Sequence, residues 1–336
     1  MTTPTPLTEE AIHELLAKIP QLRGEIAKVI VGQKAVIDEL LVAFIAGGHC
    51  LLEGLPGLGK TLLIRTLAQA VDLTFHRIQF TPDLMPSDII GTEVLEEDHV
   101  TGKRFFQFHR GPIFGQIILA DEINRTPPKT QSALLEAMSE GSVTYGGQTY
   151  ALDRPFFVLA TQNPIEQSGT YPLPEAQLDR FLLYLNIGYP DANEELTMLA
   201  NTTGLHRPRV DPVMTAADVI QLQALSREVA INEDLLDFIN RLVRATRDRS
   251  LPYVEKWIRW GAGPRAGQSL ALSSKARALL AGRFAVTLDD IHALAAPVMR
   301  HRILLNFEAE AERIETDEVI REILRLVPEP TSPLPR

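Results

Sequence analysis

The glycine-rich segment GLPGLGKT at residues 54–61 has the residue types and spacing of a phosphate-binding loop. It follows a predicted strand and precedes a predicted helix, which is the context in which this pattern binds phosphates. Backbone N–H groups of such a loop converge on phosphate oxygens, Lys60 reaches the β- and γ-phosphates, and the Thr61 hydroxyl can ligate Mg²⁺. The residues expected to contact the nucleotide are Gly54, Pro56, Gly57, Leu58, Gly59, Lys60, Thr61 and Leu62.

Polar side chains also follow two other apolar runs. Asp121 and Glu122 come directly after IILA, and Asn163 ends FFVLATQN. Ligand sites of α/β proteins lie at the carboxyl edge of the sheet, so we expect Asp121 to hold Mg²⁺ and Glu122 to orient and deprotonate the attacking water. Asn163 would position the same water. Each of these roles has a structural alternative. Asp121 and Glu122 could be solvated turn residues, and Asn163 could initiate a turn before Pro164.

The elements that must position these residues follow from apolar periodicity. Five short apolar runs, each bounded by turn residues or a helical segment, predict buried strands at 49–54, 73–80, 115–121, 155–163 and 181–187. Helical spacing at 35–46, from residue 60 to 68, and at 131–140 predicts helices between them. The fold class is therefore α/β, a parallel five-stranded sheet with helices on both faces, over residues 27–190.

The regions on either side of this sheet carry helical periodicity. Residues 1–26 are predicted to form a helical segment, with Pro20 breaking the pattern into short helices. Residues 191–327 predict a smaller all-helical domain, and the Pro-rich residues 328–336 predict a frayed tail. Two segments within the α/β region predict β-hairpins, at 91–108 and at 142–152, where Gly146 and Gly147 form the turn.

Composition excludes several classes of protein. The chain has 336 residues, 45% of them hydrophobic, and 33 Lys and Arg against 43 Asp and Glu give a net charge of −10. That charge argues against binding to nucleic acid or to an anionic membrane through bulk charge. Cys50 is the single cysteine, and the eight histidines lack metal-ligand spacing. The polar, acidic start and the lack of a long apolar run indicate no secretory signal or membrane span, so we expect a cytoplasmic protein.

Taken together, the motifs resemble those of an AAA+ ATPase, with Walker A at the glycine-rich loop, Walker B at Asp121 and Glu122, and sensor 1 at Asn163. Within that superfamily, LADEINRTPPKTQSALLEAMSE, VTYGG, LATQNP and YPLPEAQLDRF resemble the MoxR family. The resemblance runs from about Ile30 to at least Arg265.

The resemblance implies roles for residues outside the loop and strand ends. Arg180 in LDRF would be an arginine finger acting on the ATP of the neighbouring subunit, where a cation stabilises charge on the γ-phosphoryl group. Arg265 in GAGPRA would be sensor 2, reaching to the γ-phosphate from the helical domain at 191–327, which the resemblance makes the lid. The segment of Val31, Gly32 and Gln33 would lie near the adenine. The alternatives are a surface ion pair for Arg180, with Asp179 or Glu175, and a simple helix start at Arg265.

The implied function is hydrolysis of ATP with Mg²⁺ by a hexameric ring. Family resemblance implies chaperone-like maturation or assembly of client proteins, in some cases with metal-cofactor insertion, and a partner with a von Willebrand factor A (VWA) domain. The two hairpins would face the pore or the client, and Tyr145 would grip it.

Three other functions are compatible with the motifs. They are an ATPase subunit of magnesium chelatase, a nucleic-acid motor of the MCM type, and a module that binds ATP without hydrolysing it. The hairpin at 142–152 carries no Lys or Arg, which argues against the nucleic-acid motor.

Overall fold

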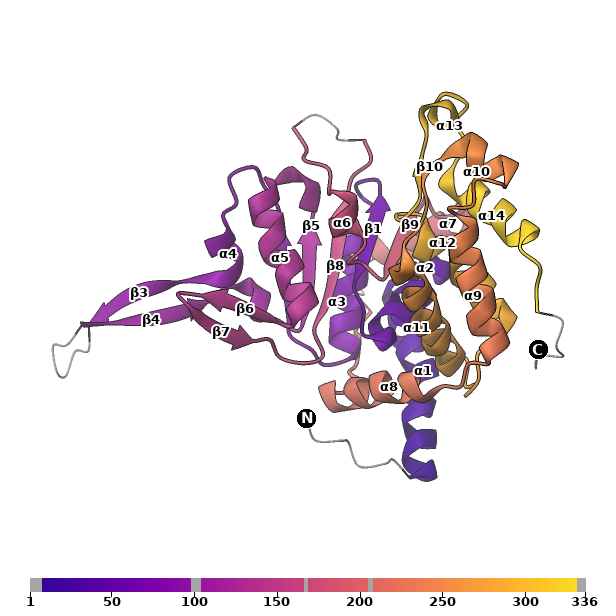
Figure 1. Ribbon diagram of the computed structural model, residues 1–336. Helices are drawn as coiled ribbons and strands as arrows, with labels where there is room; N and C mark the ends of the chain where they lie inside the picture. Colours follow the sequence, from indigo (N-terminus) through magenta and orange to yellow (C-terminus); the bar gives the residue numbers. More distant parts are fainter. Residues whose placement is uncertain (1–7, 98–103, 166–168, 205–207, 331–336) are drawn as a thin grey trace.

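A computed structural model describes residues 8–97, 104–165, 169–204 and 208–330 (Figure 1). The far end of the predicted 91–108 hairpin, residues 1–7 of the predicted helical segment and residues 331–336 of the predicted tail lie outside the described residues. No helix within the described ranges is long and apolar enough to cross a membrane.

A five-stranded sheet forms the centre of the α/β region, as predicted. Its strands, in spatial order, are β2 (Phe75–Gln79), β5 (Ile117–Asp121), β8 (Phe157–Gln162), β1 (Cys50–Gly54) and β9 (Leu183–Ile187). Every neighbouring pair is parallel. The carboxyl ends of all five strands therefore meet at one edge, and β8 lies between the strand that leads into the phosphate loop and the strand that ends in Asp121.

Helices cover both faces of this sheet because alternate strand residues point in opposite directions. Cys50 and Leu52 of β1 belong to the core shared with α1 (Glu9–Val29), α2 (Lys34–Ala46) and α3 (Lys60–Ala70). Leu51 of the same strand belongs to the core shared with α4 (Pro86–Ile90) and α5 (Pro128–Glu140). The near-continuous apolar sequence of these strands is what two covered faces require.

The N-terminal helix differs from the prediction. A break at Pro20 was expected, but α1 is one continuous helix with Pro20 inside it. Proline removes one backbone donor and disturbs one turn. Here the loss is outweighed by packing, because Leu15, Ile19, Leu22 and Ile26 lie on one face of the helix and all four are buried.

The region after β9 is helical, as predicted. Its helices are α7 (Ala192–Thr202), α8 (Ala216–Glu228), α9 (Glu233–Ala245), α10 (Pro252–Trp257), α11 (Pro264–Leu280), α12 (Leu288–Met299), α13 (Phe307–Ala311) and α14 (Thr316–Leu326). A short antiparallel pair of β10 (Ile258–Trp260) and β11 (Leu304–Leu305) was not predicted. Both α8 and α11 pack on α2, which is buried along most of its length, so the lid and the sheet share one hydrophobic core.

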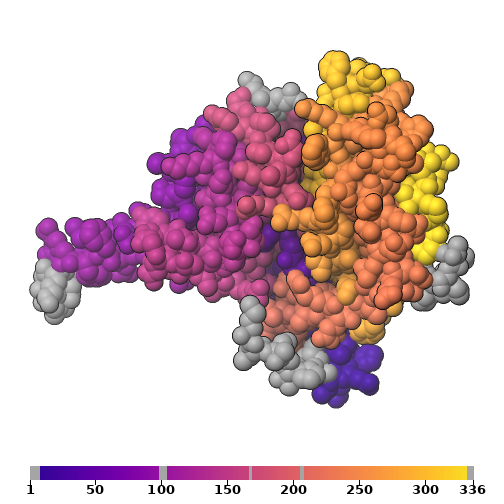
Figure 2. Space-filling view, viewed as in Figure 1, coloured from indigo at the N-terminus to yellow at the C-terminus, as the bar shows by residue number. Residues whose placement is uncertain are grey.

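Two antiparallel hairpins project from the α5 side of the sheet as an arm (Figures 1 and 2). One pairs β3 (Gly91–Glu97) with β4 (Arg104–Arg110), and the other pairs β6 (Ser142–Tyr145) with β7 (Gln148–Ala151). The Phe108 ring lies 5.1 Å from the Tyr145 ring and 4.6 Å from the Tyr150 ring, measured between centroids. Tyr145 is thus packed between the hairpins.

Candidate active site

The glycine-rich loop connects β1 to α3 at the carboxyl edge of the sheet. Gly57 and Gly59 have φ values of 85° and 76°, which glycine adopts without strain. A Cβ at either position would meet no atom within 4 Å, so both glycines border open space. Gly54 has a different role, because a Cβ there would lie 2.0 Å from Cγ2 of Ile187 on β9. The loop thus has room for phosphate groups above a tightly packed base.

Lys60, the first residue of α3, turns back over this loop. Its Nζ donates a hydrogen bond of 2.6 Å to the Gly54 carbonyl. Burial lowers the pKa of Lys60, and the nearby carboxylates of Asp121, Glu122 and Glu53 oppose that effect. The ammonium group therefore lies in the field of the acidic residues at the same sheet edge.

Asp121 ends β5 as a largely buried carboxylate with partners on both oxygens. Thr161 donates to Oδ1 at 2.6 Å, and Arg77 donates to Oδ2 from Nε at 3.1 Å and from Nη2 at 2.6 Å. The guanidinium of Arg77 thus pairs with this carboxylate. Thr61, which follows Lys60 in the first turn of α3, carries a hydroxyl oxygen. Hard oxygen donors of this kind are those Mg²⁺ prefers, so the residues fit that ion.

Glu122 follows in the left-handed region, with φ 57° and ψ 50°, which is uncommon for a residue with a side chain. Its backbone N–H donates to the Thr161 hydroxyl at 2.9 Å. Its Oε2 accepts hydrogen bonds from Gln79 at 3.1 Å and from Arg125 at 2.8 Å. The carboxylate is thus held between β2 and the turn that follows β5.

Asn163 lies directly after β8 and is 6% exposed. Its Oδ1 accepts a hydrogen bond of 3.2 Å from the Ile165 backbone N–H, which orients the side-chain amide. Because β8 runs between β1 and β5, this amide lies at the sheet edge between the phosphate loop and the acidic pair.

The segment of Val31, Gly32 and Gln33 connects α1 to α2 and lies against the start of the lid. Gln33 donates from Nε2 to the Gly188 carbonyl, just after β9, at 3.3 Å. Gly32 has φ 69°, and a Cβ there would come within 2.3 Å of the Glu194 side chain on α7. The resemblance places this segment near the adenine, and the structure places it where the sheet joins the lid.

The expected arginine finger, Arg180, and the expected sensor 2, Arg265, bond different partners. Arg180 donates from Nη1 to the Leu135 carbonyl at 2.7 Å and to the Ser139 hydroxyl at 2.9 Å, both on α5. Arg265, at the start of α11, has Nη1 3.5 Å from Oδ2 of Asp179. The expected alternative, an ion pair of Asp179 with its neighbour Arg180, is not what Asp179 forms, because its carboxylate pairs with two lid arginines.

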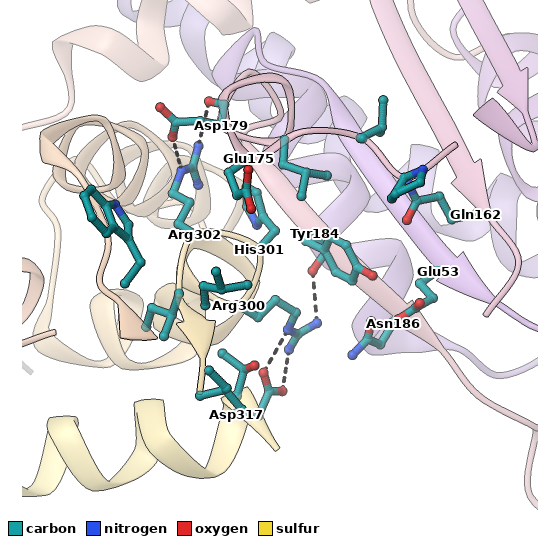
Figure 3. A pocket seen from close by; sticks show the side chains of 18 of the residues that line it. Glu53, Gln162, Glu175, Asp179, Tyr184, Asn186, Arg300, His301, Arg302 and Asp317 are labelled. Atoms are coloured by element: carbon teal, nitrogen blue, oxygen red, sulfur yellow. Dashed lines mark hydrogen bonds and ion pairs between the residues drawn. The ribbon is translucent and has the colours of Figure 1, made fainter. Parts of the chain in front are cut away.

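A cavity of about 1180 Å³ separates this cluster from the sheet edge. Asn163 lines it from the sheet. Asp179 lines it from the loop before β9, and Arg300, His301 and Arg302 line it from the lid (Figure 3). Burial and the neighbouring Glu53 raise the pKa of Tyr184 in its wall. The cavity therefore lies between Asn163 at the sheet edge and Asp179 before β9.

Several side chains at the site were missed from the sequence. Gln79 is the last polar residue of the strand predicted at 73–80, so a search for polar residues near strand ends could have selected it. Arg77 and Arg125 carried no distinguishing pattern, since their relevance depends on β2 lying beside β5 and on the turn after Glu122. Arg302 lies more than a hundred residues from its partner Asp179.

Family comparisons assign both parts of the chain. Residues 49–183 match the ATPase family associated with various cellular activities (AAA), and residues 253–323 match the AAA lid domain. A crystal structure of a candidate ATPase from Cytophaga hutchinsonii has 45% sequence identity and a TM-score of 0.87, covering 95% of this chain and 97% of that one.

Curated relatives match over nearly the full length. The uncharacterized protein YeaC of Bacillus subtilis is 44% identical, covering 96% of this chain and 97% of that protein. Chaperone MoxR1 of Mycobacterium tuberculosis is 42% identical, covering 90% of this chain and 80% of that protein. Protein MoxR of Methylorubrum extorquens is 32% identical, covering 91% and 93% respectively.

Proposed function

Because the chain belongs to the MoxR family of AAA+ ATPases, we propose that it hydrolyses ATP to ADP and phosphate and uses this reaction to remodel or assemble other proteins. The observation that carries the proposal is the placement of three groups on three neighbouring strands. The phosphate loop follows β1, Asn163 follows β8, and Asp121 with Glu122 ends β5. Loop, water-orienting amide and carboxylate base are thus adjacent at one sheet edge.

In this proposal the chain's own residues bind and orient the reactants. Backbone amides of the loop and Lys60 hold the phosphates. Glu122 accepts a proton as the water oxygen bonds to the γ-phosphorus and the bond to the ADP oxygen breaks, while Asn163 orients that water. Thr61 and Asp121 would hold Mg²⁺, which would neutralise charge on the phosphate oxygens.

Glu122 must change partners before it can act as the base. Its Oε2 accepts hydrogen bonds from both Gln79 and Arg125, and these two bonds fix the direction of the carboxylate. The described arrangement is therefore a resting one, from which Glu122 turns toward the water when ATP is bound.

We also propose that Arg180 acts on the nucleotide of a neighbouring subunit in a hexameric ring, and that Arg265 reaches from the lid to the γ-phosphate as sensor 2. Support comes from their contacts, because Arg180 bonds α5 and Arg265 pairs with Asp179, and these partners lie outside the phosphate loop. A cation supplied across an interface stabilises γ-phosphoryl charge and makes hydrolysis depend on assembly.

The chaperone role is supported by the relative named Chaperone MoxR1. We propose that the arm formed by the two hairpins contacts client proteins, and that a partner with a VWA domain joins the ring, in some cases for metal-cofactor insertion. A Glu122→Gln protein loaded with ATP, used as bait with Lys60→Ala as control, would capture such proteins if they bind the ATP state.

Two substitutions test the catalytic assignment directly. Lys60→Ala should weaken ATP binding, because it removes the cation that contacts the phosphates. Glu122→Gln should bind ATP as the wild type does but turn it over at least about a hundredfold more slowly, since a positioned general base contributes about 10²–10⁴-fold. Nucleotide binding and phosphate release, measured on the same preparations, separate the two effects. Equal turnover in Glu122→Gln and wild type would remove the base assignment.

A further inference from the structure

Arg302 is a buried lid arginine whose guanidinium holds the loop that carries Arg180. Its side chain is 3% exposed. It donates from Nε to Oδ1 of Asp179 at 2.7 Å (Figure 3). It also donates from Nη2 to the Phe181 carbonyl at 2.7 Å. A further bond of 3.3 Å runs from Nη1 to the Leu182 carbonyl. The residues on both sides of Arg180 are therefore bonded to one side chain of the lid.

The same guanidinium is anchored within the lid. It donates to the Val298 carbonyl of α12 and, at 3.1 Å, to the Ser269 hydroxyl of α11. Burial lowers the pKa of Arg302, and the carboxylate of Asp179 opposes that effect. A buried charge is tolerated only when it is paired and hydrogen-bonded, so Arg302 and Asp179 depend on each other.

Asp179 connects this anchor to the second sensing arginine. Its Oδ1 accepts from Arg302, while its Oδ2 lies 3.5 Å from Nη1 of Arg265. Arg180 is the next residue in the chain. The Asp179 carboxylate thus joins the buried anchor and the proposed sensor 2, and its backbone continues directly into the proposed arginine finger, whose guanidinium bonds α5.

We propose that Arg302 is a positioning residue that makes Arg180 and Arg265 move as one unit with the lid. The proposal rests on the proposed function, in which Arg180 acts across a subunit interface and Arg265 senses the γ-phosphate from the lid. The state of the lid then sets the position of the finger that reaches the neighbour's ATP, and the two sites are coupled through Asp179. Arg302 itself need not touch nucleotide.

Arg300 provides a matched comparison two residues away. It is 12% exposed, forms two hydrogen bonds with Asp317 and donates to the Tyr184 carbonyl on β9. It therefore also ties the lid to the sheet, but its hydrogen bonds go to Asp317 and Tyr184 and not to the loop of Arg180. If lid anchoring in general were sufficient, Arg300→Lys and Arg302→Lys would have equal effects.

The test uses subunit mixing. Lysine keeps the charge but lacks the planar fork of arginine, so Arg302→Lys cannot bond Asp179, Phe181 and Leu182 together. We expect unchanged ATP binding but at least about tenfold slower turnover, because small misplacements of catalytic groups are costly. Mixing with Lys60→Ala subunits should restore turnover above the sum of the separate preparations. Those subunits present a correctly held Arg180 to the intact phosphate loops of Arg302→Lys.

The controls separate this inference from the proposed function. Arg180→Ala mixed with Lys60→Ala should also recover, and failure there would contradict action across the interface. Two results would overturn the role of Arg302, provided that the Arg180→Ala mixture recovers. One is wild-type turnover in Arg302→Lys alone, and the other is no recovery when Arg302→Lys is mixed with Lys60→Ala. Arg300→Lys should keep its turnover. Should Arg302→Lys fail to fold, Asp179→Asn, which keeps the size of the side chain, is expected to show the same recovery on mixing.

Discussion

At the residue scale, the reactivity of Glu122 depends on side chains that are not catalytic themselves. Gln79 at the end of β2 and Arg125 in the following turn both donate to Oε2 of Glu122. Arg77 does the same for Asp121 and also bonds the Gln79 side chain. Edge strand β2 thus supplies polar groups that hold both acidic residues.

Removing Gln79 should release part of this restraint. A hydrogen bond to a charged group contributes about 1.5–3 kcal/mol, and Arg125 still holds the carboxylate in Gln79→Ala. We therefore expect turnover without any client to rise by roughly 3- to 10-fold. Steady-state phosphate release measures it, with Gln107→Ala on the exposed arm as a matched control. Unchanged or slower turnover would show that Gln79 does not restrain the base.

The residues that could be selected from the sequence are those that follow an apolar run or lie within the glycine-rich pattern. Asp121, Glu122 and Asn163 could be selected because each follows an apolar run, and Lys60 because of the pattern around it. The restraining partners could not be selected in this way. Whether Arg77 meets Asp121 depends on the register of β2 against β5, and Arg302 meets Asp179 only after the lid has packed on the sheet.

At the scale of elements, the arm formed by the two hairpins has a packed base and an exposed outer part. On one face of β4, Phe108 stacks between Tyr145, Tyr150 and Phe114, whereas Phe106 is 70% exposed. The two phenylalanines are two residues apart and point to the same side of the strand. They differ mainly in whether the second hairpin covers them.

This difference predicts opposite effects of the same substitution. Phe108→Ala should destabilise the protein by about 1–2 kcal/mol, because aromatic pairs contribute roughly 0.5–1.5 kcal/mol each beyond area burial. Phe106→Ala should stay within about 0.5 kcal/mol of the wild type, as for other exposed positions. Thermal unfolding of both variants measures this. Equal losses would mean that the second hairpin does not pack on Phe108.

Helix α2 carries a titratable group between the sheet and the lid. Burial raises the pKa of Glu39 to about 7, the charge of Arg300 opposes this, and Asp317 and Asp38 add to it. The folded protein therefore prefers Glu39 protonated. Its stabilising contribution is complete below the unfolded pKa of about 4.5 and is lost as the pH rises through about 7.

Glu39→Gln should remove this part of the pH dependence. Relative to the wild type, the variant should gain stability between about pH 5 and about pH 8, by up to roughly 3 kcal/mol, since tenfold in proton affinity corresponds to about 1.4 kcal/mol. Melting temperatures of both proteins across that range provide the measurement. Parallel curves for variant and wild type would show that Glu39 does not titrate in this range.

The elements themselves were mostly predictable, with one instructive error. Strands buried on both faces and the hairpin turn at Gly146 and Gly147 have strong local signals, and the structure confirms them. Pro20 has an equally strong local signal, for a break, and that prediction was wrong. Its local cost is a single turn, and the burial of Leu15 and Ile26 on either side holds the helix together.

At the scale of the whole molecule, one subunit presents two functional surfaces. In the proposed function, one surface binds ATP at the carboxyl edge of the sheet, and the other carries Arg180, which bonds α5, and Arg265, which pairs with Asp179. The cavity lined by Asn163 and Asp179 lies between them. In the proposed ring, each subunit needs one neighbour to receive its Arg180 and another to supply Arg180 to its own ATP. The sequence of a single chain predicts this only through family resemblance, because no local pattern encodes an assembly.

The most direct measurement of the central claim is ATP turnover per subunit as a function of protein concentration, with particle mass determined on the same samples. Turnover should fall on dilution together with the mass of the assembly, because Arg180 acts on a neighbour's nucleotide. Arg180→Ala should assemble as the wild type does and remain slow at every concentration. Turnover that is independent of concentration in a verified monomer would contradict hydrolysis across a subunit interface.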